Sequence, residues 1–221
     1  MTSDSAPRRS RWPLVLLAVT LAAIVAFAIR PIREPILRAA GWALVVNETL
    51  APVDIIVLSL DSGGAGALEA ADLVQNGIAQ RVAVFTDPPG GEDFEFIRRG
   101  LPYEDASARQ IRQLRSLGVT DIVQIPRADE GTEGESTILP AWCKEHHIRS
   151  LVFVAARDHS RRARRVLERT MKDQGVRVTV QPARYSSFDP DRWWQTRGGI
   201  RIGIIELQKL LLDLLRHPMP N

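Results

Sequence analysis

The sequence predicts an α/β fold in which a mostly parallel sheet of about five strands lies between two layers of helices. Three observations support this prediction. Short apolar runs rich in β-branched residues, typical of strands buried on both faces, alternate with segments of helical periodicity. The segments between these runs are long enough for the crossovers that connect parallel strands. The 221 residues, 45% of them apolar, fit one globular domain with a short extension.

The individual elements follow from the same periodicity. Strands are expected at residues 54–60, 81–85, 121–125, 150–156 and 177–181. Helices are expected at residues 68–76, 104–117, 137–147, 161–173 and 202–215. Residues 91–102 and 127–135 are polar and contain glycine, and we interpret both segments as loops. In such sheets ligands bind outside the carboxyl ends of the strands, so candidate site residues are sought there.

The N-terminal segment predicts a membrane anchor. Three arginines at positions 8, 9 and 11 precede residues 12–29, which are uncharged and mostly apolar. We therefore divide the chain into a basic tail (1–12), a transmembrane helix (13–30), a juxtamembrane linker or helix (31–50), the α/β domain (51–216) and a tail (217–221). The basic tail favours a single pass through the cytoplasmic membrane, with the domain on the periplasmic or extracellular side. A signal peptide cleaved near Ala28 is the alternative, and Arg30, Arg33 and Arg38 leave the inverse orientation open.

Charge and cysteine content exclude several other classes. Six arginines against Asp4 and Glu34 give the first 40 residues a charge of +4, so residues 41–221 carry −1 of the total of +3. The basic character belongs to the N-terminal flank and does not indicate nucleic-acid binding. The single cysteine, Cys143, excludes an intramolecular disulfide and a cysteine-based zinc site. We predict no metal site.

The loop after the first strand is rich in glycine and begins a helix. Backbone N–H groups at Gly63 and Gly64 could therefore bind a phosphate or a carboxylate, with Ser59 beside them. Asp61 in the same loop is a candidate second proton carrier or cation ligand. A tight turn in which Ser62 caps the helix is the alternative interpretation.

The same loop matches half of a dinucleotide-binding motif. Asp87 ends the second strand at the place of a ribose-binding acid, but Glu69 occupies the place of the third glycine. A nucleotide ligand is therefore an alternative that places Asp87 in the site.

The loop after the fourth strand carries the most informative residue, His159. A histidine just past a buried strand, at the start of a helix, is well placed for general acid/base chemistry or for binding an anion. Arg162, three residues later, could face the same turn, and Arg157 precedes it. In an extended chain Asp158 would point away from His159, so a His–Asp pair is not expected. A structural hydrogen-bonding role for His159 stays open, and the following arginines are interpreted as solvated or paired with acids.

Two further segments have competing interpretations. The acidic segment ends at Glu135 and is followed by Thr137, which could cap a helix; its carboxylates could bind a cation with Asp61, pair with arginines, or simply be solvated. Trp193 and Trp194 are expected to pack under the last helix, with a carbohydrate or lipid platform as the alternative.

The order of these features resembles one known family. The pieces are an N-terminal apolar segment, the strand Asp-Ile-Ile-Val-Leu at 54–58, the helix end Leu-Val-Gln-Asn-Gly-Ile-Ala at 73–79, a Ser-Thr before a helix, and His159-x-x-Arg-Ala after Val-Phe-Val. Over residues 40–215 the chain resembles the YdcF/SanA/ElyC-like family. The resemblance implies a Rossmann-like domain and a role in the cell envelope, tied to barrier function and to the lipid carrier of peptidoglycan synthesis. It also implies S-adenosylmethionine as a possible cofactor, because one soluble relative is associated with it.

We therefore expect a membrane-anchored envelope protein that binds an anionic, phosphate-bearing small molecule or lipid-carrier headgroup at the carboxyl edge of the sheet. His159 and Asp61 are the candidate catalytic residues. The candidate ligand-binding residues are Ser59, Gly63, Gly64, Asp87, Glu135, Thr137, Arg157 and Arg162. A transferase-like protein that binds S-adenosylmethionine or a nucleotide, and a scaffold without enzymatic activity, are the alternatives.

Overall fold

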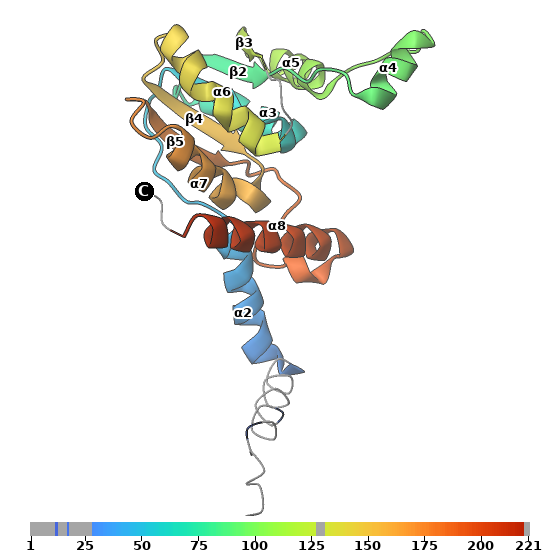
Figure 1. Cartoon of the computed structure of the whole chain (residues 1–221), viewed down its shortest axis with the longest axis vertical. Helices are drawn as coiled ribbons and strands as arrows, with labels where there is room; N and C mark the ends of the chain where they lie inside the picture. Colours follow the sequence, from blue (N-terminus) through green and yellow to red (C-terminus); the bar gives the residue numbers. More distant parts are fainter. Residues whose placement is uncertain (1–11, 13–16, 18–27, 127–130, 219–221) are drawn as a thin grey trace, which may run out of the picture.

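A computed structural model describes residues 12, 17, 28–126 and 131–218 (Figure 1). Most of the expected transmembrane helix, residues 13–30, lies outside the described residues. None of the helices within the described ranges combines the length and the apolar character needed to cross a membrane.

The centre of the molecule is a five-stranded sheet in which every strand is parallel to its neighbours. Its strands are β1 (Ile55–Leu58), β2 (Arg81–Phe85), β3 (Asp121–Ile125), β4 (Ser150–Ala155) and β5 (Arg177–Pro182). They lie in the order β3-β2-β1-β4-β5. Every residue of β1 and β4 is buried, as the apolar runs 55–58 and 151–155 predict. The α/β class and the five strands are confirmed, and the sheet is entirely parallel.

Helices cover the sheet (Figure 1). The described helices are α2 (Arg30–Ala43), α3 (Gly63–Gln75), α4 (Gly91–Arg98), α5 (Ala106–Ser116), α6 (Gly131–Glu145), α7 (Ser160–Thr170) and α8 (Arg197–Arg216). Helix α3 packs beside α5, and α6 packs beside α7, so these four helices, which connect successive strands, form two packed pairs. Short 3₁₀ turns follow β1 (Leu60–Ser62), follow β4 (Arg157–His159) and precede α8 (Trp193–Gln195).

Both segments interpreted as loops contain helix, so those two predictions were wrong. Helix α4 occupies part of residues 91–102; the Asp93 carboxylate accepts the Gly90 N–H at 2.8 Å, and Glu95 pairs with Arg98 and Arg99. None of its residues is buried, so no apolar periodicity marked it. Helix α6 begins at Gly131, well before the expected start, because Glu135 is buried against the turn after β1.

A second, smaller core joins α2 to α8. It contains Leu44, Phe188, Trp193 and Leu210. The Trp193 indole Nε1 donates to the Leu37 carbonyl at 2.7 Å, which fixes α2 on the turn before α8. The expected packing of Trp193 under the last helix is therefore confirmed.

Helix α8 is also held to α7 by charge. The Asp213 carboxylate accepts from Arg165 Nε at 2.5 Å and from Arg169 Nη2 at 2.7 Å. Burial raises the pKa of Asp213, but the hydrogen bonds and charges of the two arginines outweigh it, so the pKa lies below its usual value. Arg164 pairs with Glu48 at 2.6 Å, so these arginines are paired with acids, one of the two roles expected for them.

Replacement of Gly41 tests the α2–α8 junction. A methyl group there would meet the Pro190 carbonyl oxygen and lie 2.7 Å from Trp193 Cδ1, so the Gly41→Ala variant must shift backbone. We expect it to lower the free energy of unfolding by about 1–3 kcal/mol, measured by urea denaturation. Gly198→Ala is the matched control, because no atom lies within 4 Å of its added Cβ. Equal stability of the two variants would show that the junction is loosely packed.

Acidification tests the Asp213 clamp. Because the folded pKa of Asp213 is lowered, its stabilisation is complete above the unfolded value of 3.8 and is lost as pH falls through the lower folded value. The stability difference between wild type and Asp213→Asn should therefore narrow below about pH 3.8 in urea denaturation series. Asp121→Asn, which removes a half-exposed pair with Arg81, should give a small difference at every pH. A gap that stays constant down to the acid limit would contradict the clamp.

Candidate functional site

The strand order places the site. Successive strands run outward from β1 on one side through β2 and β3, and on the other side through β4 and β5. The direction of winding therefore reverses between β1 and β4, which opens a crevice outside their carboxyl ends. A pocket of about 440 Å³ lies there. Its lining residues are Asp61, Ser62, Ala65, Ala156, Asp158, His159, Arg162, Ser186, Ser187, Ile202, Glu206 and Lys209.

His159 is a buried titratable group that lines this pocket. It ends the 3₁₀ turn after β4, and only 4% of its surface is exposed. Its Nε2 atom is buried and has no hydrogen-bond partner among the described residues. A buried polar atom normally has a partner, since leaving it unpaired costs about 1–3 kcal/mol. His159, which lines the pocket and carries this unpaired nitrogen, is therefore the strongest sign of a ligand among the described residues.

Asp158 lies beside His159, contrary to the expectation that it would point away. The expectation assumed an extended chain, whereas the 3₁₀ turn brings Asp158 Oδ2 to 3.8 Å from His159 Nδ1. Burial alone raises the pKa of Asp158. The hydrogen bond and charge interaction with His159 and the charge of Lys209 together outweigh burial, so the pKa lies below its usual value. Asp158 is therefore a carboxylate held beside the Nδ1 side of the imidazole.

A charge cluster forms the opposite wall. Glu206, in the middle of α8, is 6% exposed and accepts from Arg162 Nε at 3.3 Å and from Lys209 Nζ at 2.7 Å. Arg162 and Lys209 share the single carboxylate of Glu206, so this wall carries one more positive charge than negative charges. Asp61 lines the pocket and is exposed, so it sits at the rim.

Ser59 and Glu135 support the pocket from behind. The Ser59 hydroxyl donates to Glu135 Oε2 at 2.8 Å, and the Leu60 N–H donates to Glu135 Oε1 at 2.9 Å. Gln110 adds a bond from its amide to the Ser59 carbonyl at 3.1 Å. Both Ser59 and Glu135 are buried away from the pocket, so they position the turn that carries Asp61 and Ser62. Glu135 is therefore not part of a solvated loop.

The remaining candidate residues lie elsewhere. Gly63, at φ +51°, begins α3, and Gly64 faces the Gln113 side chain of α5. None of the following lines the pocket: Gly63, Gly64, Asp87, Thr137 and Arg157.

Asp87, Thr137 and Arg157 each form a structural contact outside the pocket. The Asp87 carboxylate accepts the Ala106 N–H at 3.4 Å, and the Thr137 hydroxyl donates to the Gly134 carbonyl at 3.0 Å within α6. The Arg157 guanidinium lies 5.5 Å from the centre of the Trp42 ring and so ties the β4 turn to the end of α2.

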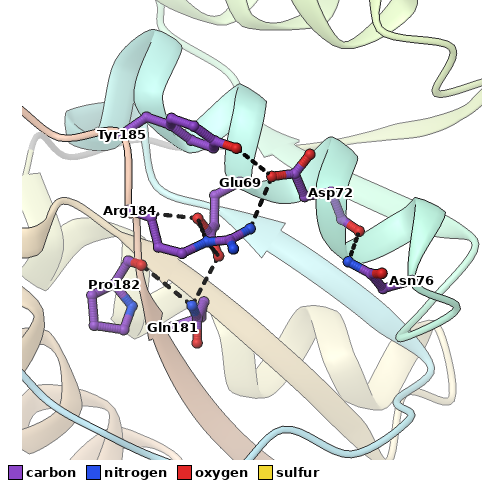
Figure 2. Close-up of polar contacts among 7 residues, drawn as sticks. All are labelled: Glu69, Asp72, Asn76, Gln181, Pro182, Arg184 and Tyr185. Carbon is purple, nitrogen blue, oxygen red and sulfur yellow. Dashed lines mark hydrogen bonds and ion pairs between the residues drawn. The ribbon is translucent and has the colours of Figure 1, made fainter.

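The loop after β5 is held in place by a buried carboxylate, Glu69. Figure 2 shows Glu69 and Asp72 of α3 reaching the end of β5 and the loop after it. Glu69 accepts from the Gln181 amide of β5 at 2.8 Å and from the Arg184 backbone N–H of the loop at 3.0 Å. The Arg184 guanidinium also pairs with Glu69 at 2.9 Å and with Asp72 at 2.8 Å. These contacts fix the segment that delivers Ser186 and Ser187 to the pocket.

Six polar or charged residues that line the pocket were not among the candidate site residues: Ser62, Asp158, Ser186, Ser187, Glu206 and Lys209. Candidate residues were sought only in loops at the carboxyl ends of strands, whereas Glu206 and Lys209 lie in the C-terminal helix. The apolar sequence of that helix indicated packing on the sheet. Glu206 and Lys209, an acid and a base three residues apart in an apolar run, were the available signal.

Comparisons with known proteins leave the family open. No protein-family model and no curated protein matches the chain. A universal stress protein in complex with cAMP is 15% identical, with a TM-score of 0.36 over 60% of this chain and 99% of that chain. The reductase domain of an aureusimine biosynthetic cluster is 13% identical, with a TM-score of 0.28 over 56% of this chain and 39% of that chain. Such distant likenesses assign no ligand, so the function is argued from the site alone.

Replacement of Glu69 tests the latch on the β5 loop. Glu69→Ala leaves the Arg184 N–H and the Gln181 amide without their acceptor, so we expect a loss of about 2 kcal/mol in the free energy of unfolding. Asp72→Ala is the control on the same helix; its more exposed pair with Arg184 should cost less than about 1 kcal/mol. Equal losses in urea denaturation would show that Glu69 is not the residue that holds the loop.

Proposed function

We propose that the pocket between β1 and β4 binds an anionic, phosphate-bearing molecule and that His159 acts there as a general acid/base. The observation that carries the proposal is the unpaired Nε2 atom of the buried His159 on the pocket wall. The crevice at a reversal of strand order is also where parallel sheets of this type bind their ligands.

The two cations of the α7–α8 wall, Arg162 and Lys209, support an anion. Asp158 lies beside His159, and Glu206 is shared between Arg162 and Lys209. Asp61 is exposed at the rim, where water screens its charge. The α7–α8 wall therefore offers a cation to a phosphate oxygen, through the charge-assisted hydrogen bonds that arginine and lysine form with phosphate.

The orientation of His159 suits proton transfer at Nε2. When Nδ1 carries the proton toward Asp158, the neutral ring presents an unprotonated Nε2 that accepts a proton from a hydroxyl group or water. The protonated ring gives that proton to a leaving oxygen. Ser186 and Ser187 line the same pocket and supply hydroxyl groups that hold the remaining phosphate oxygens.

The second part of the proposal is membrane attachment. Residues 12–29 are uncharged and mostly apolar and follow a basic stretch, which favours an anchor with the α/β domain on the far side of the cytoplasmic membrane. Helix α2 begins at Arg30, directly after this segment in the sequence, and joins the domain at α8 (Figure 1). A phosphate ligand is then either a lipid headgroup or a free small molecule of the envelope, in line with the resemblance to the YdcF/SanA/ElyC-like family.

The nucleotide alternative finds less support. The acid on which it depends, Asp87, accepts the Ala106 N–H. Glu69, which stands in place of the third glycine of the motif, is buried against Arg184. Neither lines the pocket.

A ligand panel on the full chain in detergent tests the binding proposal. Inorganic phosphate, glycerol phosphate and a short-chain phosphatidic acid are compared by thermal shift, which separates a free phosphate from a lipid headgroup. A ligand at about one hundred times its Kd should stabilise the protein by about 2.7 kcal/mol, a rise of a few degrees in Tm. His159→Ala should abolish the response, and Lys209→Gln should weaken binding by about tenfold or more, since it removes one charge-assisted contact.

Lys172→Gln is the matched control, because Lys172 is exposed and lies outside the pocket. Its response should equal that of wild type. A response that survives in both pocket variants, or no response of wild type to any phosphate, would contradict the proposal and favour a scaffold.

A further inference from the structure

Helix α8 has an outer face that the protein core does not use. Its exposed apolar residues are Ile200, Ile204, Ile205, Leu211, Leu212, Leu214 and Leu215. The exposed cations on this face are Arg197, Arg201 and Arg216. We call these residues the outer face of α8. Leu215 is 71% exposed and Leu211 58%, so the apolar side chains lie well clear of the small α2–α8 core.

The charges of this face have one sign. Helix α8 contains two acids, Glu206 and Asp213, and both point inward, to Arg162 and to the arginines of α7. Arg197, Arg201 and Arg216 form no ion pair with any residue that the structure describes. The exposed isoleucine and leucine side chains of this face favour an apolar partner, and its charged side chains, all of them arginines, favour a negatively charged partner. Among the possible occupants, an anionic bilayer surface has this chemistry.

The position of α8 relative to α2 points to the same occupant. The C-terminal part of α2 packs against the small core with α8 through Leu37 and Ala40. From there α2 extends away from the sheet toward Arg30 (Figure 1). Its other end, Arg30, adjoins the uncharged segment 12–29. An anchor in that segment therefore places the membrane on the side of α8 that faces away from the sheet.

The distances are compatible with contact. From Arg30 to Ala40, α2 rises about 15 Å, and about 5 Å of this is taken up by the outward radius of α8 and its side chains. The remaining gap of about 10 Å is comparable to a headgroup layer of about 5–8 Å, together with the reach of an arginine side chain. We propose that the outer face of α8 rests on the headgroup layer of the membrane that holds the anchor, with Arg197, Arg201 and Arg216 bound to lipid phosphates. This rests on the membrane attachment proposed above.

The test uses the full chain, reconstituted into vesicles of zwitterionic lipid with or without anionic phosphatidylglycerol. Leu211→Cys carries an environment-sensitive fluorophore, and Leu101→Cys, 49% exposed in the native chain, is the control. Leu101 follows α4, which lies at the opposite end of the molecule from α2 (Figure 1). The native Cys143 does not compete for the label, because it is buried and burial raises its pKa to about 11.

We expect nitroxide-labelled headgroups to quench the probe at position 211 and to leave the probe at position 101 unchanged. Quenching should increase with phosphatidylglycerol. The double variant Arg197→Gln/Arg201→Gln should weaken the contact by about fivefold for each cation removed, because a basic residue near such a surface contributes about 1 kcal/mol.

Vesicle flotation separates the two ways of failing. A chain that does not float with vesicles lacks the anchor, and the proposed attachment fails with this inference. A chain that floats but shows no quenching at position 211 keeps its anchor and overturns the α8 contact alone. Quenching between labelled copies without nitroxide lipid would assign the outer face to a second copy of this chain and would also overturn the proposal.

Discussion

The site depends on the parallel pairing of β1 with β4. Because β4 joins β1 on the side opposite β2, the connections leave the two strands in opposite directions and a crevice forms at their carboxyl ends. Two buried carboxylates keep the surrounding loops in place: Glu135 fixes the turn after β1, and Glu69 fixes the loop after β5. The sheet thus creates the crevice, and Glu135 of α6 and Glu69 of α3 hold the loops that line it.

Helix α8 links the pocket to the rest of the chain. Its inner side presents Glu206 and Lys209 to the pocket and Asp213 to α7, while Trp193 joins it to α2. A tilt of α8 would therefore change the pocket wall and the α2 junction together. If α2 continues into a membrane anchor, the pocket is held at a fixed height above the bilayer, which suits a ligand that is itself part of the envelope.

The sequence predicted those parts of the fold that depend on local pattern. The strands were found because fully buried runs such as 55–58 and 151–155 are continuously apolar. Helix α4 was missed because its apolar side chains are exposed, and the start of α6 because Glu135 is buried by a contact with residues distant in the sequence. Of the candidate site, Asp61, His159 and Arg162 meet in one pocket. The pairing of His159 with Asp158 needed the 3₁₀ turn, and the wall from α8 needed the tertiary fold.

The most direct test of the central claim is a ¹⁵N NMR titration of the histidine rings in the full chain in detergent with glycerol phosphate. The His159 resonances are assigned by their loss in His159→Ala. The account predicts that Nε2 of His159 shifts on binding while the rings of His146, His147 and His217 stay unchanged. An unchanged His159, or equal shifts at the exposed histidines, would show that the pocket does not bind the phosphate and would contradict the account.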